Sequence, residues 1–406
     1  MRTLVLSAAL VAGVMPASAG AQTLPLTESQ LLAQLAPETP QVQVARAGVD
    51  VARAESLLAG RWPNPRVTYN REAVAGITED MVMVSQLLPI TGTRRWEISA
   101  AAARVDAATS RADGRLRRLR ADLRLAFTDL WEAQTREREL ARSLDQLRDL
   151  AGVLNRREAA GEAAGFDTLR ADREVISVEA DRAGAAADRG RAQAIVASFL
   201  ATARAAAIEA VRDDPVRREL PTVDDLIVIA ERSHGELVAL ERELDAAAFT
   251  ERAAARRSIP QPEIVAGTKS STAGGGDMGS IIGVHVAVPL FDRARAERAA
   301  AQARSRQLRA ESEAFRRTLR AQVTAWHATV TERRAIADRF RAAIATGVDQ
   351  IERIAQVSYE AGEGSILELL DAYRTALSAR TRLVALDAAV REAEIELEFV
   401  SGWEIP

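Results

Sequence analysis

Two carboxylates near the C-terminal end of the chain have the spacing of a charged ring. Glu368 and Asp371 are three residues apart, so they share one face of a helix. In a threefold assembly they would form two stacked rings of negative charge, which select for cations and repel one another. The alternative is a pair of solvated acids on an exposed helix face. Asp167 and Asp172 occupy the corresponding region of an earlier, similar stretch of the chain.

Two short turns built from small residues lie next to these carboxylates. They are Ala160-Gly161-Glu162 and Ala361-Gly362-Glu363, the second followed by Ser365. Glycine permits a tight reversal because it adopts positive φ without strain. Small exposed residues also leave room for another helical hairpin to dock on the turn. Tyr359 precedes the second turn, where it either closes a passage through hydrogen bonds or simply packs.

The other chemistry-bearing residues predict no catalytic centre and no cofactor. Cysteine is absent, and the three histidines share no metal-ligand spacing. Gly274-Gly275-Gly276 lies between two predicted strands, so a surface loop is the better interpretation than a phosphate site. Trp62 and Trp96 flank the first strand pair, where they either anchor a membrane interface or only pack. We therefore expect a protein that is not an enzyme and holds no resident metal ion.

These features recur because the chain repeats itself at an offset of about 200 residues, as duplicated units do. Pro63-Asn64-Pro65 and Pro260-Gln261-Pro262 each open an extended stretch. The two stretches close at Pro89 and Pro289, and a long helical pattern follows each. Each copy is thus predicted to be a pair of strands joined to a long helical hairpin.

The predicted strands alternate between apolar and small or polar residues. Ile282, Val284, Val286 and Val288 share one face of the last strand. Such alternation is typical of a membrane barrel strand, although a sandwich strand would look similar. We expect strands at 67–72 and 81–88 around a turn at 73–80, strands at 263–269 and 281–288 around a turn at 270–279, and a helix before the first pair at 27–58.

The helical pattern is strongest in the first copy. From Leu116 to Leu154, Leu and Ala recur at steps of three and four residues, and only Glu137 interrupts this seam. Phe340 to Ile354 keeps the same register in the second copy. Without internal proline, each first arm runs about 65 residues, or roughly 100 Å. The returning helices are predicted at 166–211 and 366–399.

The N-terminus indicates the cellular compartment, and the overall charge limits the classes of partner. Residues 1–21 are predicted to be a signal peptide, with Arg2 before an apolar run and small residues before the cleavage site. No later apolar stretch reaches the length of a membrane helix, so a membrane crossing would require strands. The formal charge of -3, with acids and bases interleaved, argues against nucleic-acid binding.

Four strands per chain cannot close a barrel, and open edges are not tolerated in lipid. Three chains would supply twelve strands, whereas two chains would supply eight. The predicted fold class is mainly α with a membrane β-barrel portion. The predicted division is a first repeat at 22–215, with strand pair 65–89 and helical hairpin 92–211, and a second repeat at 216–406, with strand pair 262–289 and helical hairpin 292–402.

The chain resembles the TolC family of outer-membrane efflux proteins over essentially its whole mature length. The most specific stretch is Tyr359 to Ala372, which is similar to the family's tip-and-gate pattern of Tyr-x-x-Gly followed by acidic-x-x-Asp-Ala. Asn64-Pro65, Ser85 to Pro89 and Gly92 to Arg95 resemble the CzcC-like heavy-metal efflux subgroup. Unlike many relatives of that type, this chain lacks a lipidated cysteine. It also carries Glu363 to Ser365 where some members place a basic residue.

The resemblance implies a TolC-like homotrimer with a 12-stranded β-barrel in the outer membrane and an α-helical barrel extending into the periplasm. It implies a passive exit duct for substrates, heavy-metal cations included, that works with a periplasmic adaptor protein and an inner-membrane pump of the RND type. In this interpretation Glu368, Asp371, Tyr359 and Asp167 form the periplasmic gate, and the two turns and Ser365 dock the adaptor. The alternatives are an exit duct for protein secretion and a periplasmic coiled-coil scaffold.

Overall fold

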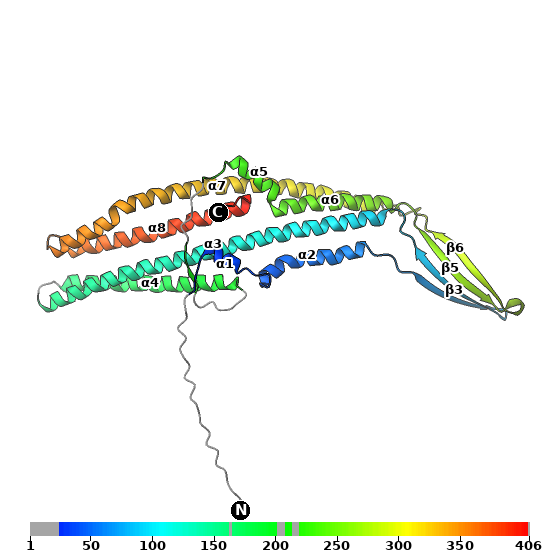
Figure 1. The fold of residues 1–406 in the computed structure, drawn as a ribbon, viewed down its shortest axis with the longest axis horizontal. Helices are drawn as coiled ribbons and strands as arrows, with labels where there is room; N and C mark the ends of the chain where they lie inside the picture. The colour runs from blue at the N-terminus through cyan, green and yellow to red at the C-terminus, as the bar shows by residue number, and fades with distance from the viewer. Residues whose placement is uncertain (1–23, 162–164, 201–207, 213–218, 405–406) are drawn as a thin grey trace, which may run out of the picture.

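The chain folds into a long helical body with a small sheet at one end (Figure 1). The structure is a computed structural model, and it describes residues 24–161, 165–200, 208–212 and 219–404. The predicted signal peptide at 1–21 and the turn residue Glu162 lie outside the described residues.

Two long helices form the frame of the body. α3 (Thr93–Ala159) has 67 residues and α7 (Arg295–Glu360) has 66 residues, so each spans roughly 100 Å. Each turns at its far end into a returning helix, α4 (Gly165–Ser198) or α8 (Ile366–Ser401). The predicted hairpins are confirmed, although α4 ends well before the expected residue 211.

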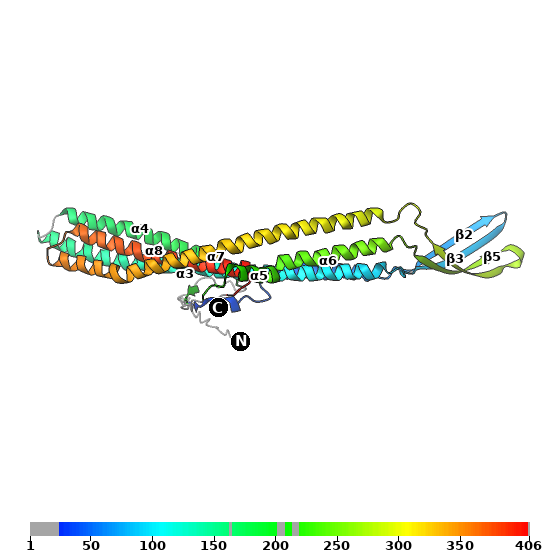
Figure 2. The ribbon, with the colours of Figure 1, turned by 90° about the horizontal axis from the view of Figure 1, so that it is seen from above.

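The two hairpins lie side by side through α3 and α8, with α4 and α7 on the outside of the group (Figure 2). In the half of the body nearer the sheet, α2 (Pro40–Ala59) packs on α3, and α6 (Gly235–Arg256) fills the space between α3 and α7. A short helix, α5 (Val223–Ser233), precedes α6 and contacts α7 and α8. Neither α5 nor α6 was predicted from the sequence.

The four strands form one antiparallel sheet in the order β2-β3-β5-β6. The central pairing joins the two copies, with Val84 of β3 opposite Ala266 of β5. β2 and β6 are therefore the two edges of this sheet, and neither edge is paired within the described chain. The strands are β2 (Arg66–Val74), β3 (Ile77–Leu87), β5 (Pro262–Ser271) and β6 (Asp277–Val286).

The strands extend further than the sequence analysis predicted. β2 and β3 are joined by Ala75 and Gly76 alone, both at positive φ, so the expected long turn at 73–80 was wrong. Thr78 and Asp80 pair with residues of β2, which shows that polar side chains do not end a strand when the backbone ladder continues. Between β5 and β6 the turn is also shorter than the expected 270–279 and holds a 3-10 turn, Ala273–Gly275.

α1 and the end of α8 both lie near the middle of the long axis of the body (Figure 1). β1 (Leu24–Leu26) pairs in parallel with β4 (Ile208–Ala210), and neither strand was predicted. The expected single helix at 27–58 was wrong, because α1 (Glu28–Ala33) ends before α2 begins at Pro40. Proline at that position starts a helix readily but cannot continue one.

The core follows the predicted seam of the first copy. The seam leucines from Leu123 to Leu154 are buried, with Leu144 completely so. Glu137, the polar residue in the seam, makes an ion pair of 2.9 Å with Arg189 of α4. The seam is therefore continuous through its one charged position.

Candidate functional site

The second hairpin tip is a tightly bonded turn. Gly362 has φ of +75°, and the backbone N–H groups of Glu363 and Gly364 both donate to the carbonyl of Ser358 at 2.9 Å. A Cβ at Gly364 would lie 3.2 Å from that of Ser358, so the turn has little room for a larger residue. Ala361, Gly362 and Glu363 remain exposed. The predicted turn is thus present, and its surface is accessible.

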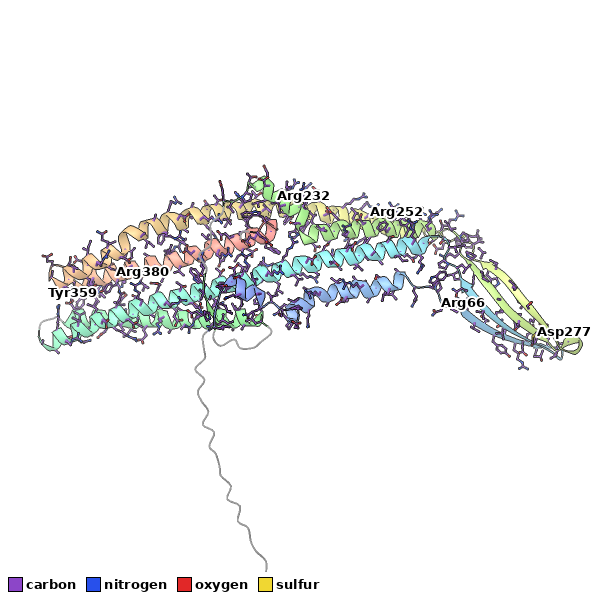
Figure 3. All side chains as sticks on the ribbon, in the orientation of Figure 1. Arg66, Arg232, Arg252, Asp277, Tyr359 and Arg380 are labelled. Carbon is purple, nitrogen blue, oxygen red and sulfur yellow. The ribbon has the colours of Figure 1, made fainter. Side chains whose placement is uncertain are left out.

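The first tip has a similar reversal. Ala160 follows the last turn of α3, and Gly161 has φ of +79°. The Gly161 N–H donates to the carbonyl of Glu158 at 2.8 Å. Both residues are exposed. The two tips lie at the end of the helical body opposite the sheet, as the positions of Tyr359 and Asp277 show in Figure 3.

α8 begins with a capping box that uses one of the predicted gate carboxylates. The Ser365 N–H donates to Oε2 of Glu368 at 2.9 Å, and the Glu368 N–H donates to Oγ of Ser365 at 3.3 Å. Such reciprocal bonds satisfy two backbone donors at the start of a helix. Glu368 is exposed, and so is Asp371 one turn later. The sequence analysis missed the cap, although the Ser-x-x-Glu spacing predicts it.

The other two predicted gate residues lie at the same end of the body. Tyr359 is half-buried against the hydrophobic cluster that includes Leu369 and Leu370, and the Arg157 guanidinium lies 6.0 Å from its ring centre. Asp167 is half-buried in the first turn of α4. The four residues thus share one end of the molecule, but no hydrogen bond or ion pair joins any of them within the part of the chain that the structure describes.

An ion pair that was not predicted joins α4 of the first sequence repeat to α8 of the second repeat, close to the hairpin tips. The Arg374 guanidinium of α8 holds the Glu174 carboxylate of α4 with two hydrogen bonds, the Nε–Oε1 distance being 2.6 Å. Glu174 is buried, whereas Arg374 reaches the surface. The two residues are 200 positions apart, which is the repeat offset. The sequence therefore has a glutamate at one position and an arginine at the equivalent position of the other repeat. This opposite charge at equivalent positions is a signal from which the ion pair could have been predicted.

The sheet has one apolar face and one mixed face. We call the residues Val67, Tyr69, Val82, Val84, Ile264, Ile282, Val284 and Val286 the apolar face, because the register puts them on one side and all of them are exposed. This arrangement confirms the alternation predicted for Ile282 to Val286. The opposite side carries Glu79 and Lys269, 2.5 Å apart in an ion pair, and His285 opposite Glu263.

The outer helices of the two hairpins leave apolar side chains uncovered. α4 exposes Phe166, Leu169 and Ile176, and α7 exposes Ile351, Ile354 and Val357. These six residues, which we call the edge residues, lie towards the tip ends of α4 and α7, the two outer helices of the group. Each of the two helices thus carries its own group of exposed apolar side chains, and such groups mark a contact with another protein surface.

A buried ionic network holds the N-terminal segment against α3 and α8. Glu28 of α1 accepts from Arg124 at 2.5 Å and from Arg391 at 2.8 Å, and Arg124 also bonds Glu398. Burial raises the pKa of the Glu398 carboxyl, and the neighbouring Arg124 offsets part of that effect. The charges of the network are largely removed from water, so each depends on its partner.

A second group of acids lies where α3 meets α8. Burial raises the pKa of Glu132, and the negative charges of Glu392 and Asp129 raise it further. The pKa of Glu392 is raised in the same way, by burial first and then by Asp129. No group of three or more His, Asp or Glu side chains in the described ranges is placed to hold a metal ion.

Among the described residues, no helix is long and apolar enough to cross a membrane.

Known proteins share both the sequence pattern and the fold. The family model described as outer membrane efflux protein matches residues 226–402. The cobalt-zinc-cadmium resistance protein CzcC of Cupriavidus metallidurans is 24% identical over 380 residues, which cover 93% of this chain and 90% of that protein.

Solved structures agree with this assignment at the level of the fold. The outer-membrane channel OprN superimposes with a TM-score of 0.77 at 19% identity, covering 92% of this chain and 89% of that one. The outer membrane protein VceC of Vibrio cholerae gives a TM-score of 0.75 at 17% identity, covering 93% and 97%. The family model, the relative and the fold agree: residues 226–402 match the outer membrane efflux protein family, and the chain has the fold of the solved outer-membrane channels.

Proposed function

We propose that three copies of this chain form a passive exit duct in the outer membrane that serves a tripartite efflux system. The observation that carries the proposal is the sheet. It has an exposed apolar face, and its two edges are unpaired within the described chain, at the end of helices roughly 100 Å long. Lipid tolerates such a sheet only when its edges are closed, and β6 of one copy pairing with β2 of the next would close a barrel. Three copies give the 12 strands of a TolC-type channel.

The edge residues support the same assembly in the helical part. When three copies close a ring, α7 of one copy meets α4 of the next, and both helices bring apolar side chains to that contact. Helices with such stripes pack as coiled coils. The division of the chain into repeats at 22–215 and 216–406 fits this view, because each repeat then supplies two strands and one hairpin.

We place the gate at the tips and give Glu368 and Asp371 the role of carboxylate rings, with Tyr359 and Asp167 beside them. Both acids are exposed at the start of α8, where three copies would face one another across a narrow mouth. Rings of carboxylates favour the passage of cations. Since Glu368 also caps its helix, its carboxylate is held in position before any cation arrives.

The cargo we propose is a divalent metal cation handed over by a pump. The relative that matches along nearly the whole chain is a cobalt-zinc-cadmium resistance protein, and it supports this class of substrate. The partners would be an inner-membrane pump of the RND type and a periplasmic adaptor. The adaptor would dock on the two tips, which are Ala160, Gly161 and Glu162 in the first repeat and Ala361, Gly362, Glu363 and Ser365 in the second.

A conductance experiment tests the gate separately from the fold. Glu368→Gln keeps the capping box, because glutamine makes the same reciprocal bonds, but it removes the charge. Combined with Asp371→Asn, it should lower the preference for cations over anions, which the reversal potential in a planar bilayer under a KCl gradient measures. Glu55→Gln on the exposed surface of α2 is the control and should change nothing. Unchanged selectivity in the double variant would remove these residues from the gate.

Growth on metal tests the cargo. Deletion of the gene should increase sensitivity to zinc, cobalt and cadmium salts, and a plasmid copy should restore resistance. If the purified protein forms conducting trimers but its loss leaves metal tolerance unchanged, the duct stands and the cargo is wrong. A monomer without conductance would contradict the duct itself.

A further inference from the structure

The junction between the sheet and the helices carries exposed apolar side chains in both copies. Just after β3, Ile90 follows Pro89 and is 70% exposed, and just after β6, Leu290 follows Pro289 and is 64% exposed. Phe291, the next residue, is 99% exposed. A phenylalanine that touches nothing in its own chain costs free energy in water, so this position requires a covering surface.

The second junction is held in one conformation by its own backbone. The Leu290 N–H donates to the carbonyl of Val288 at 2.9 Å, and the Ala294 N–H donates to Oδ1 of Asp292 at 3.0 Å. Ala294 is buried with φ of +55°, a conformation that a residue other than glycine rarely adopts. Phe291 is therefore presented outward by a bonded turn.

Two arginines at the same end of the helices lack a carboxylate partner among the described residues. Arg95 and Arg252 both lie at the Trp96 ring, with guanidinium carbons 5.6 and 5.0 Å from its centre. Trp96 in turn stacks on Phe249 at 5.9 Å. Neither arginine makes an ion pair within the described ranges. The indole ring of Trp96 is therefore in contact with two guanidinium groups that have no carboxylate partner there.

The acids of this region are already engaged. Glu97 pairs with Arg257 at 2.9 Å, Glu297 lies 3.9 Å from the same arginine, and Glu251 accepts from Gln302 at 2.8 Å. Asp292 bonds the backbone of its own turn. None of these acids pairs with Arg95 or Arg252 in the described chain, and an external anion would supply that partner.

We propose that this junction is a binding surface for anionic phospholipid headgroups in the periplasmic leaflet of the outer membrane. Arg95 and Arg252 would hold the phosphate, and Ile90, Leu290 and Phe291 would enter the acyl region beside it. Aromatic and basic side chains favour such an interface. The proposal rests on the membrane insertion proposed above, because the apolar face of the sheet sets the depth at which the junction meets lipid. For a chain without a lipidated cysteine, it supplies an additional anchor at the inner edge of the barrel.

Lipid titration of the purified trimer tests the charged part. Native mass spectrometry should show tighter binding of phosphatidylglycerol than of phosphatidylcholine. Arg95→Gln and Arg252→Gln should each lower the phosphatidylglycerol affinity roughly fivefold, the effect of about 1 kcal/mol for one basic residue near a membrane surface. Arg232→Gln is the matched control, since Arg232 is also exposed but lies on α5, away from the sheet (Figure 3). Equal phosphatidylglycerol affinity in all variants, or the same loss in the control, would overturn the proposal.

A label at Phe291 tests the apolar part. The chain has no cysteine, so Phe291→Cys can carry a single fluorophore. In vesicles with phosphatidylglycerol we expect quenching by nitroxides attached near the lipid carbonyls, and Arg232→Cys should be quenched only by aqueous iodide. Quenching of position 291 by iodide, or by neither reagent because a neighbouring copy covers it, would refute the lipid contact. If the labelled variants still form conducting trimers, the proposed exit duct stands, whichever reagent quenches the label at position 291.

Discussion

The two helical hairpins have the same design, but their first arms are buried to different extents. Leu154 of α3 is 1% exposed, whereas its equivalent in α7, Ile354, is 57% exposed. The reason is position, since α3 stands between α4 and α8, and α7 has only α8 beside it near the tips. An equal sequence pattern therefore gives a core in one copy and an uncovered edge in the other.

This difference indicates where a second chain would pack against the first. Within the chain, Leu154 of α3 and Leu369 of α8 meet in one buried cluster. Their equivalents, at the repeat offset of about 200 residues, are Ile354 of α7 and Leu169 of α4. Both are exposed in the single chain, and a second copy would bring them together in the same way.

Cross-linking gives the largest expected effect, because its outcome is the presence or absence of a covalent bond between chains. With cysteine at positions 169 and 354, oxidised trimers should yield linked multimers on denaturing gels. The matched pair, Leu154→Cys with Leu369→Cys, should yield only an internally linked monomer. Multimers from the 154/369 pair, or no multimers from the 169/354 pair, would show that neighbouring chains do not pack in the way that the two repeats pack within one chain.

Truncation should separate folding from assembly. Leu144→Ala removes a completely buried side chain and should lower the free energy of unfolding by about 2–5 kcal/mol. Ile354→Ala should leave the helical melting of the detergent-isolated monomer unchanged and weaken the trimer instead. Circular dichroism melts and the fraction of trimer surviving mild heating measure the two quantities. If the two variants lowered the melting temperature equally, the two hairpins would not differ in their contribution to the stability of the monomer.

The ion pair between the copies should have an intermediate effect. Arg374→Ala leaves Glu174 buried without its partner, so we expect a loss of roughly 1–3 kcal/mol. Arg382→Ala, an arginine on the same helix without an ion pair among the described residues, is the control. The double variant Arg374→Ala with Glu174→Gln should recover part of the loss, and an absence of recovery would argue against direct coupling.

A pH titration should give the smallest effect and tests the contact of α3 with α8. The pKa of Glu132 is raised by burial and by Glu392 and Asp129, so the folded chain binds protons more tightly than the unfolded chain. Stability at this contact should therefore rise as the pH falls from neutral through the raised pKa towards the ordinary glutamate pKa. Glu132→Gln should be more stable at neutral pH and less dependent on pH, and an unaltered pH profile would contradict this origin.

Local periodicity was sufficient to predict the strands, the long helices and the seam of α3. It could not say that the equivalent seam of α7 is uncovered, because burial there depends on which helix stands beside it. β1 and β4 were missed for a related reason, since three-residue strands carry no periodic signal and exist through their pairing across the chain. At the tips, the residue types predicted an exposed acidic turn, and the Ser-x-x-Glu spacing of Ser365 and Glu368 was a sequence signal for the capping box that was overlooked.

The ionic network at Glu28 has a consequence for the order of folding. Glu28 and Arg391 are 363 positions apart, so their contact can form only when almost the entire chain has been delivered and α8 has docked on α3. Closing so long a loop is entropically unfavourable until local structure has formed. The N-terminal helix should thus be among the last elements to settle, and its attachment would report that both hairpins are complete. A chain truncated before α8 would keep the bond between Glu28 and Arg124 but would lose the Arg391 and Glu398 half of the network.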